Sequence, residues 1–445
     1  MKKIFILTLT FFALSVQAQD LKQSYSFTLQ QAIEHAREYN YSVINSGRDI
    51  EAAREKKWET TAMGLPQINA GLDFTDNFVL QKSVVPAEFF GGKPGEYTEV
   101  AFGTKFNMMA RSTLSQLIFN GSYIVALQAS KAYLRFYKNA KQKTDIDIKE
   151  MVINSYGNVL LAKENIVILE KNIASLQKTL NDTKAIYKNG LIEEESVEQL
   201  QITLASLEST LNYNNRLLDI TYKMLKINLG IEISDQLTLT DKLEDLTLQN
   251  MDLTFSENEF NVNDNINHKI ALNFEEQRRL EYKLEKSKAL PSLAANLNFG
   301  YTAFNNQFQF FTQNQSWFNY SNVGVSLNVP IFSSLARSSR TQQAKIALDQ
   351  AKTQLTETEQ KLKLQYASAK TDYEYSIADY TTAKSNLNLA ERIEKKQQIK
   401  FTEGLSTSFD FNDAQRQLYS AQQKYLETMV NIINRKASLE KIITK

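Results

Sequence analysis

The residues that could support chemistry are few, and the most informative are two aspartates near the end of the chain. Asp410 and Asp413 stand three positions apart, a spacing that puts both carboxylates on one face of a helix. Acids at the start of a helix are stabilised by the helix dipole, and Thr407 with Asp410 has the spacing of a capping box. Taken alone, these residues favour a helix cap over a binding site.

The composition excludes several other kinds of site. The 445 residues include no cysteine, which removes disulfides, thiolate catalysis and thiolate metal ligands. Only two histidines occur, and His35 is expected to be exposed on a polar helix rather than to bind a metal. The net charge is +1, so no basic face for nucleic acid is indicated. Because no nucleophile motif, metal-ligand spacing or phosphate loop is present, we expect neither an enzyme nor a cofactor.

The aspartates follow a glycine turn that the chain contains twice. Two residue pairs, 214 positions apart, form it: Gly190 with Leu191, and Gly404 with Leu405. The stretch LPQINAGLDF, residues 65–74, also matches a later one, LPSLAANLNF at 290–299. A glycine after a helix can take the left-handed conformation that ends it, so each turn predicts an antiparallel helical hairpin. The pattern indicates the duplication of one large unit.

Apolar or aromatic residues recur every seven positions on both sides of each turn. They are Val152, Val159, Ile166, Ile173 and Leu180; Val197, Leu204, Leu211, Leu218 and Leu225; Tyr366, Tyr373, Tyr380 and Leu387; and Phe411, Leu418, Tyr425, Ile432 and Leu439. Such spacing is typical of helices packed along their length in a left-handed supercoil. We expect helical hairpins at about 121–230 and 335–443, with helices up to about 100 Å long.

Four other segments alternate between apolar and small polar residues, which predicts strands at about 66–82, 100–118, 291–306 and 318–332. One interpretation is a pair of soluble hairpins packed on a core, but an isolated two-stranded hairpin is marginally stable in water. The other is a membrane β-barrel, with the apolar faces outward and aromatic residues near the loops. Four strands are too few to close a barrel, so two chains would share eight strands, or three chains twelve.

The N-terminal residues have the pattern of a secretory signal. Lys2 and Lys3 precede the apolar run IFILTLTFFALSV, and small residues follow, which predicts a signal peptide at 1–18. The alternative is a membrane anchor, but the run is shorter than the roughly 18–20 residues that a spanning helix needs. We therefore expect export without a transmembrane helix.

Together these features resemble the outer-membrane efflux protein (TolC) family. The pieces that carry the resemblance are TLQQAIEHAREYN at 28–40, the Leu-Pro steps into strands, NVPIF at 328–332 and the two glycine-turn hairpins. Each piece is weak alone, but their order, duplication and spacing are together specific. One departure is Tyr41, which stands where the family usually has a proline, so a kink after the opening helix is less certain.

The resemblance implies a mainly α fold with membrane β-structure, in two tandem repeats at 19–231 and 266–445. It implies a homotrimer with a shared twelve-stranded barrel in outer-membrane lipid and long hairpins forming a periplasmic α-barrel. The inter-repeat segment 232–265 would lie in a small equatorial region, and the Gly-Leu turns would be the periplasmic tips. The implied function is a passive exit duct. Its implied partners are a periplasmic adaptor protein and an inner-membrane transporter of the RND or ABC type.

The resemblance also suggests a pore constriction at Asp410, Asp413 and Phe401. In a trimer, three copies would place six carboxylates near one axis, where they would favour cations. Helix capping by Asp410 and packing of the hairpin end by Phe401 remain the other interpretations. The first tip is acidic, and either it is a solvated helix start or it docks a basic adaptor tip; its acids are Glu193, Glu194, Glu195 and Glu198.

Two further alternatives stay open at this point. A secreted coiled-coil scaffold would explain the long helices, although a rod has no need of the strand pairs. Within the duct hypothesis, the sequence does not separate drug or metal efflux from type I protein secretion.

Overall fold

The computed structural model describes residues 23–252 and 260–444, and the expected signal peptide at 1–18 lies outside these ranges. The chain forms two compact units. The first contains residues 1–45, 143–261 and 362–445, and the second contains 46–142 and 262–361. The units do not coincide with the sequence repeats, because each repeat contributes residues to both units.

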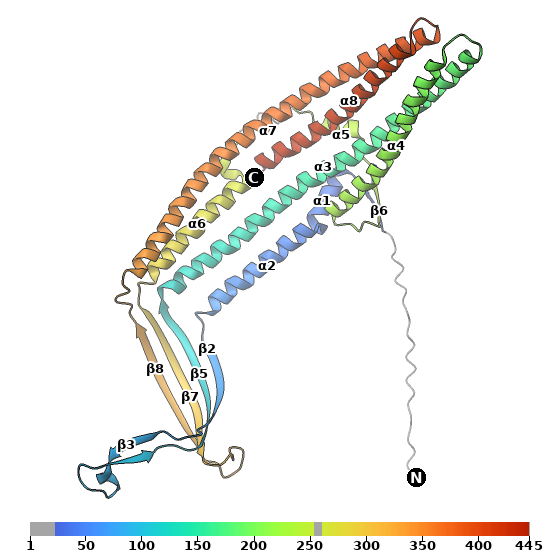
Figure 1. Ribbon diagram of the computed structural model, residues 1–445. Helices are drawn as coiled ribbons and strands as arrows, with labels where there is room; N and C mark the ends of the chain where they lie inside the picture. Colours follow the sequence, from blue (N-terminus) through green and yellow to red (C-terminus); the bar gives the residue numbers. More distant parts are fainter. Residues whose placement is uncertain (1–22, 253–259, 445) are drawn as a thin grey trace, which may run out of the picture. The chain divides into compact units, whose positions relative to one another are not determined.

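The second unit is built on a four-stranded antiparallel sheet (Figure 1). Its strands lie in the order β2 (Gln67–Asp76), β5 (Phe106–Asn120), β7 (Ser292–Asn305) and β8 (Trp317–Asn328). The helices of this unit are α6 (Ile266–Ser287), most of α2 (Tyr41–Ala62) and the adjoining parts of α3 (Gly121–Lys188) and α7 (Ala336–Thr402). Each strand is followed or preceded by one of these helices in the chain, as the Leu-Pro steps predict.

The connection between β2 and β5 differs from the expectation of two long strands. β2 ends at Asp76 and β5 begins at Phe106. Between them lies a separate hairpin of β3 (Lys82–Pro86), the short helix η1 (Ala87–Phe90) and β4 (Tyr97–Ala101). The strands predicted at about 66–82 and 100–118 were therefore too long at the ends that face this hairpin, by residues 77–82 and 100–105.

The first unit holds the two helical hairpins and a small mixed region. The hairpin helices are the remaining parts of α3 and α7 with α4 (Glu194–Leu229) and α8 (Ser408–Ile443). The mixed region has α1 (Leu29–Tyr39), α5 (Leu243–Asn250) and a parallel pair of β1 (Ser24–Phe27) with β6 (Gln236–Leu239). The short helix η3 (Val262–Asp264) already belongs to the second unit. No helix within the described ranges is long and apolar enough to cross a membrane.

Two buried tyrosines attach the mixed region to the long helices. The Tyr156 hydroxyl in α3 lies 3.0 Å from the Asp241 carboxylate just before α5. The Tyr373 hydroxyl in α7 donates to the carbonyl of Asn250 at 2.6 Å and accepts from the N–H of Asp252 at 2.9 Å. Both tyrosine side chains are fully buried, so these contacts join the inter-repeat segment to the core.

The opening helix breaks at Asn40 even though no proline follows it. Asn40 has extended backbone angles between α1 and α2. Its side chain accepts a hydrogen bond from the N–H of Ser42 and donates one to the carbonyl of Asn228. Capping by asparagine therefore accompanies a break directly before Tyr41, without the proline that the resemblance leads one to expect there.

Candidate functional site

The two glycine turns close both helical hairpins in the same way. Gly190 and Gly404 have φ angles of 72° and 70°, in the left-handed region. At each turn the glycine N–H donates to a carbonyl three residues back, and the leucine N–H donates to one five residues back. This is the Schellman arrangement that satisfies the last carbonyls of a helix. Leu191 and Leu405 are both 77% exposed, so the turns end in two apolar side chains facing solvent.

Phe401 packs the end of its hairpin within one protomer. Its ring stacks on Phe411 with centroids 5.3 Å apart, and only 5% of the residue is exposed. Leu176 and Leu200 of the other hairpin belong to the same buried cluster. The contact corresponds to the packing interpretation of Phe401, and its role at a constriction stays a prediction.

Asp410 caps α8. Its carboxylate accepts hydrogen bonds from the hydroxyl of Thr407 at 2.7 Å and from the Thr407 N–H at 3.3 Å, while the Asp410 N–H donates to the Thr407 hydroxyl. These bonds, that of the hydroxyl first, hold the pKa of Asp410 below its ordinary value. Asp410 is exposed, so the capping carboxylate remains accessible to ions.

Asp413 forms an ion pair that the sequence reasoning missed. The guanidinium of Arg416 lies 2.9 Å from one Asp413 oxygen, and the amide of Gln417 donates to the other at 2.7 Å. The i, i+3 spacing of Asp413 and Arg416 was the signal that could have revealed it. Within one chain, the two aspartate carboxylates therefore have the guanidinium of Arg416 beside them.

A groove of about 560 Å³ runs between the two turns. Both hairpins contribute to it, and its lining includes Ile186, Ile192, Glu193, Glu195, Thr407 and Phe409. Acidic and apolar groups thus line one open surface. Among the described residues, no group of three or more histidine, aspartate or glutamate side chains could hold a metal ion.

His35 is half-buried rather than exposed as expected. Its ring stacks on Tyr39 with centroids 4.5 Å apart, and its Nδ1 lies 3.1 Å from the carbonyl of Leu229. Burial lowers the pKa of His35. The residue therefore joins α1 to the end of α4.

The four-stranded sheet has one apolar and one polar face. The pairing register places four apolar residues in one row across the strands: Ile68, Leu114, Leu297 and Val323. The two outer residues of that row, Ile68 and Val323, are 74% and 73% exposed. Four β-strands with such a face would be unstable in water without a cover.

The next row, on the opposite face, is polar across all four strands. It contains Asn69, Thr113, Asn298 and Asn322. The hydroxyl of Thr113 donates to Asn298, and the amide of Asn298 donates to Asn322, both at 2.9 Å. This ladder joins three strands, so the polar face is ordered by side-chain hydrogen bonds.

Residues 274–444, which run from within α6 to the end of the described chain, match the sequence model of the outer membrane efflux protein family. This part of the chain, less than half of its length, is therefore similar in sequence to outer membrane efflux proteins. Among curated proteins, no sequence matches the chain.

Solved structures share the fold over nearly the whole chain. The outer membrane protein VceC from Vibrio cholerae has a TM-score of 0.71 at 16% identity, covering 93% of this chain and 95% of its own. The CmeC outer membrane channel of Campylobacter jejuni has a TM-score of 0.72 at 16% identity, covering 93% of this chain and 85% of its own. CusC has a TM-score of 0.75 at 15% identity, covering 97% and 96%. The predicted fold, mainly helical with four long strands, is confirmed.

Two helices of the chain carry a second, exposed apolar stripe beside the heptad one. On α4 the stripe is exposed and lies opposite the buried one; its residues are Ile202, Tyr213, Ile220, Met224 and Ile227. On α7 the corresponding exposed residues are Leu364, Tyr375, Leu389 and Ile393. At 100° per residue, each set lies within a narrow arc of its helix. Both helices are therefore apolar on two sides.

Proposed function

We propose that three copies of this chain form a passive exit duct, in which each copy gives four strands to one twelve-stranded barrel. The observation that carries the proposal is the sheet, with an exposed apolar face, a hydrogen-bonded polar face and free edges at β2 and β8. In lipid, unpaired strand edges are not tolerated, and four strands are too few to close a barrel. Pairing of β8 in one copy with β2 in the next would remove every edge.

The second apolar stripes of α4 and α7 support the same assembly. A helix that is apolar on two sides packs against two neighbours, and within one protomer only one side of each is buried. Tyr213 of α4 and Tyr375 of α7, exposed by 66% and 67%, lie at the middle of these stripes. Contact of α4 in one copy with α7 in the next would cover both and close a ring of helices.

The tip groove supports a periplasmic partner. Glu193 and Glu195 border the groove, and Leu191, Leu405 and Phe409 are exposed beside it. An adaptor hairpin that presents a basic residue between apolar side chains would match this surface in charge and hydrophobicity. We therefore propose that the duct receives its substrates from an inner-membrane transporter through such an adaptor.

Electron microscopy and mass measurement of the detergent-extracted protein test the assembly. We expect a threefold hollow particle with a detergent-covered end and a helical part about 100 Å long. A monomer that needs no detergent would overturn the duct, and the secreted coiled-coil scaffold would then explain the helices better.

A further inference from the structure

The hairpin between β2 and β5 is held firmly at its base. The backbone N–H of Asn77 donates to the carbonyl of Lys105 at 2.7 Å, and the Asn77 side chain donates to the carbonyl of Thr104 at 2.9 Å. The N–H of Lys105 in turn donates to the Asn306 side chain at 3.1 Å, at the base of the β7–β8 loop. These bonds fix the direction in which the hairpin leaves the sheet.

The hairpin exposes more apolar surface than two strands can cover. Phe89 and Phe90 in η1 are 80% and 60% exposed, Val84 is 67% exposed and Tyr97 is 72% exposed. Among the described strands β3 pairs only with β4, and a two-stranded hairpin is marginally stable in water. A contiguous apolar surface of this kind indicates a partner.

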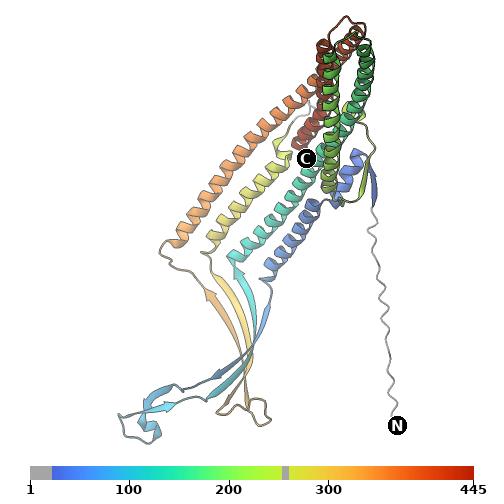
Figure 2. The ribbon, with the colours of Figure 1, turned by 45° about the vertical axis from the view of Figure 1, so that its right-hand side comes forward.

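The β7–β8 loop shows which side of the sheet is already covered. Phe308 and Phe310 fold back onto the apolar face, where both rings meet Phe74 of β2 edge-on at 5.5 and 6.0 Å between centroids. In Figures 1 and 2 the hairpin and this loop extend from the end of the sheet in opposite directions. Because the loop lies on the apolar side, the hairpin leans toward the polar side.

We propose that the hairpins of three copies meet over the mouth of the duct and cap its outer end. The proposal rests on the trimeric duct proposed above, in which the polar face lines the lumen. A segment that leans over the lumen is directed away from lipid and toward the symmetry axis, where it meets its own copies. The partner of the apolar hairpin surface is therefore the same surface of the neighbouring chains.

Cysteine crosslinking tests the cap directly, since the chain has no native cysteine. Phe89→Cys places a thiol on the hairpin, and Phe311→Cys is a matched control because both phenylalanines are 80% exposed. With an oxidant, the Phe89→Cys protein is expected to form covalent dimers from most of its trimers, whereas Phe311→Cys stays monomeric on denaturing gels. The mass of each variant in detergent is measured in parallel.

The two measurements separate the hypotheses. A trimer mass without a Phe89→Cys crosslink would overturn the cap and leave the duct intact, and a monomer mass would overturn the duct itself. Crosslinking of Phe311→Cys to the same extent would reveal non-specific contact and also count against the cap.

Conductance provides an independent readout. Replacing residues 82–101 with a short Gly-Ser linker keeps the hydrogen bonds of Asn77 at the base. Removal of a cap over the lumen is expected to raise the single-channel conductance about twofold in a planar bilayer. An unchanged conductance in a variant that still assembles as a trimer would contradict the cap.

Discussion

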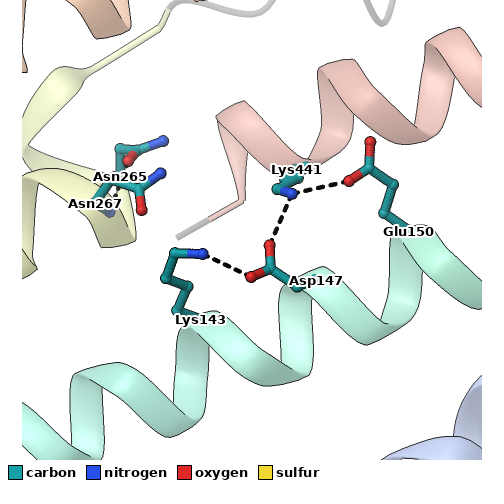
Figure 3. A network of polar contacts seen from close by, with 6 residues as sticks. All are labelled: Lys143, Asp147, Glu150, Asn265, Asn267 and Lys441. Carbon is teal, nitrogen blue, oxygen red and sulfur yellow. Dashed lines mark hydrogen bonds and ion pairs between the residues drawn. The ribbon is translucent and has the colours of Figure 1, made fainter.

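The ammonium group of Lys441, near the end of α8, lies 2.7 Å from the carboxylate of Asp147 in α3 (Figure 3). The same ammonium lies 2.9 Å from Glu150, and Lys143 approaches Asp147 at 2.6 Å from one turn earlier in α3. All four side chains are between one fifth and about two fifths exposed. This network holds the C-terminal end of α8 against α3.

Replacement of Lys441 should weaken that attachment. Lys441→Met removes two ion pairs and leaves Glu150 without this cation, while Asp147 keeps Lys143, so we expect the free energy of unfolding to fall by about 1–2 kcal/mol. Urea unfolding followed by circular dichroism measures the loss. Lys352→Met is the control, because Lys352 pairs with Asp349 on an exposed surface, where ion pairs contribute little. Equal effects of the two substitutions would contradict a specific role for the network.

The same network predicts a stability change in acid. Burial raises the pKa of Asp147, but the hydrogen bonds from Lys143 and Lys441 outweigh it and leave the pKa below its ordinary value of 3.8. A carboxylate with a lowered pKa in the folded state stabilises the protein above its ordinary pKa, and this contribution is lost as the pH falls through the lowered value. Asp147→Asn should therefore show a smaller stability loss than the wild type below about pH 4. If Asp147→Asn and the wild type lost equal amounts of stability as the pH falls, this role of Asp147 would be contradicted.

Tyr373 should be important for docking the inter-repeat segment. Tyr373→Phe removes the hydroxyl that bonds Asn250 and Asp252, and it leaves a carbonyl and an N–H without that partner. We expect a loss of about 1–3 kcal/mol in the free energy of unfolding. Tyr41→Phe, at a tyrosine that is 54% exposed, should change it by less than about 0.5 kcal/mol. If Tyr373→Phe left the free energy of unfolding unchanged, the segment would be held by its apolar contacts alone.

Replacing glycine by alanine should change the free energy of unfolding in opposite directions at a left-handed turn and inside a helix. Gly404 has a φ of 70°, so Gly404→Ala should destabilise the hairpin end by about 1–2 kcal/mol. Gly47 lies inside α2 with no atom near an added Cβ, so Gly47→Ala should stabilise by about 0.5–1 kcal/mol. Hydrogen exchange of the amides near each site locates the change. If both variants shifted stability in one direction, the conformational argument would fail.

Sequence periodicity predicted the long helices and the faces of the sheet because both patterns extend over many residues. It missed β1, since four residues are too few to show a period and their partner β6 lies more than 200 residues away. It also missed the β3–β4 hairpin, whose five-residue strands enclose a segment with Pro94 and three glycines. The ion pair with Arg416 lies in the helical turn after the two aspartates, where the spacing of the aspartates alone does not show it.

Arg416 allows the most specific test of whether the two aspartates line a pore constriction. If Asp410 and Asp413 line a constriction, the guanidinium at 2.9 Å offsets one of the two carboxylates in each copy. Asp410→Ala combined with Asp413→Ala should then reduce cation selectivity or cation block of single channels.

Arg416→Gln should have the opposite effect, because it leaves both carboxylates in place without their counter-charge. Reversal potentials in a salt gradient measure the selectivity of each variant. Lys424→Gln is the matched control: Lys424 lies two turns further along α8 and pairs with Asp379 of α7 at 2.9 Å. Removal of its charge should change selectivity less than Arg416→Gln does. If the double aspartate variant and Arg416→Gln both leave selectivity and block unchanged, the aspartates only cap and pack the start of α8.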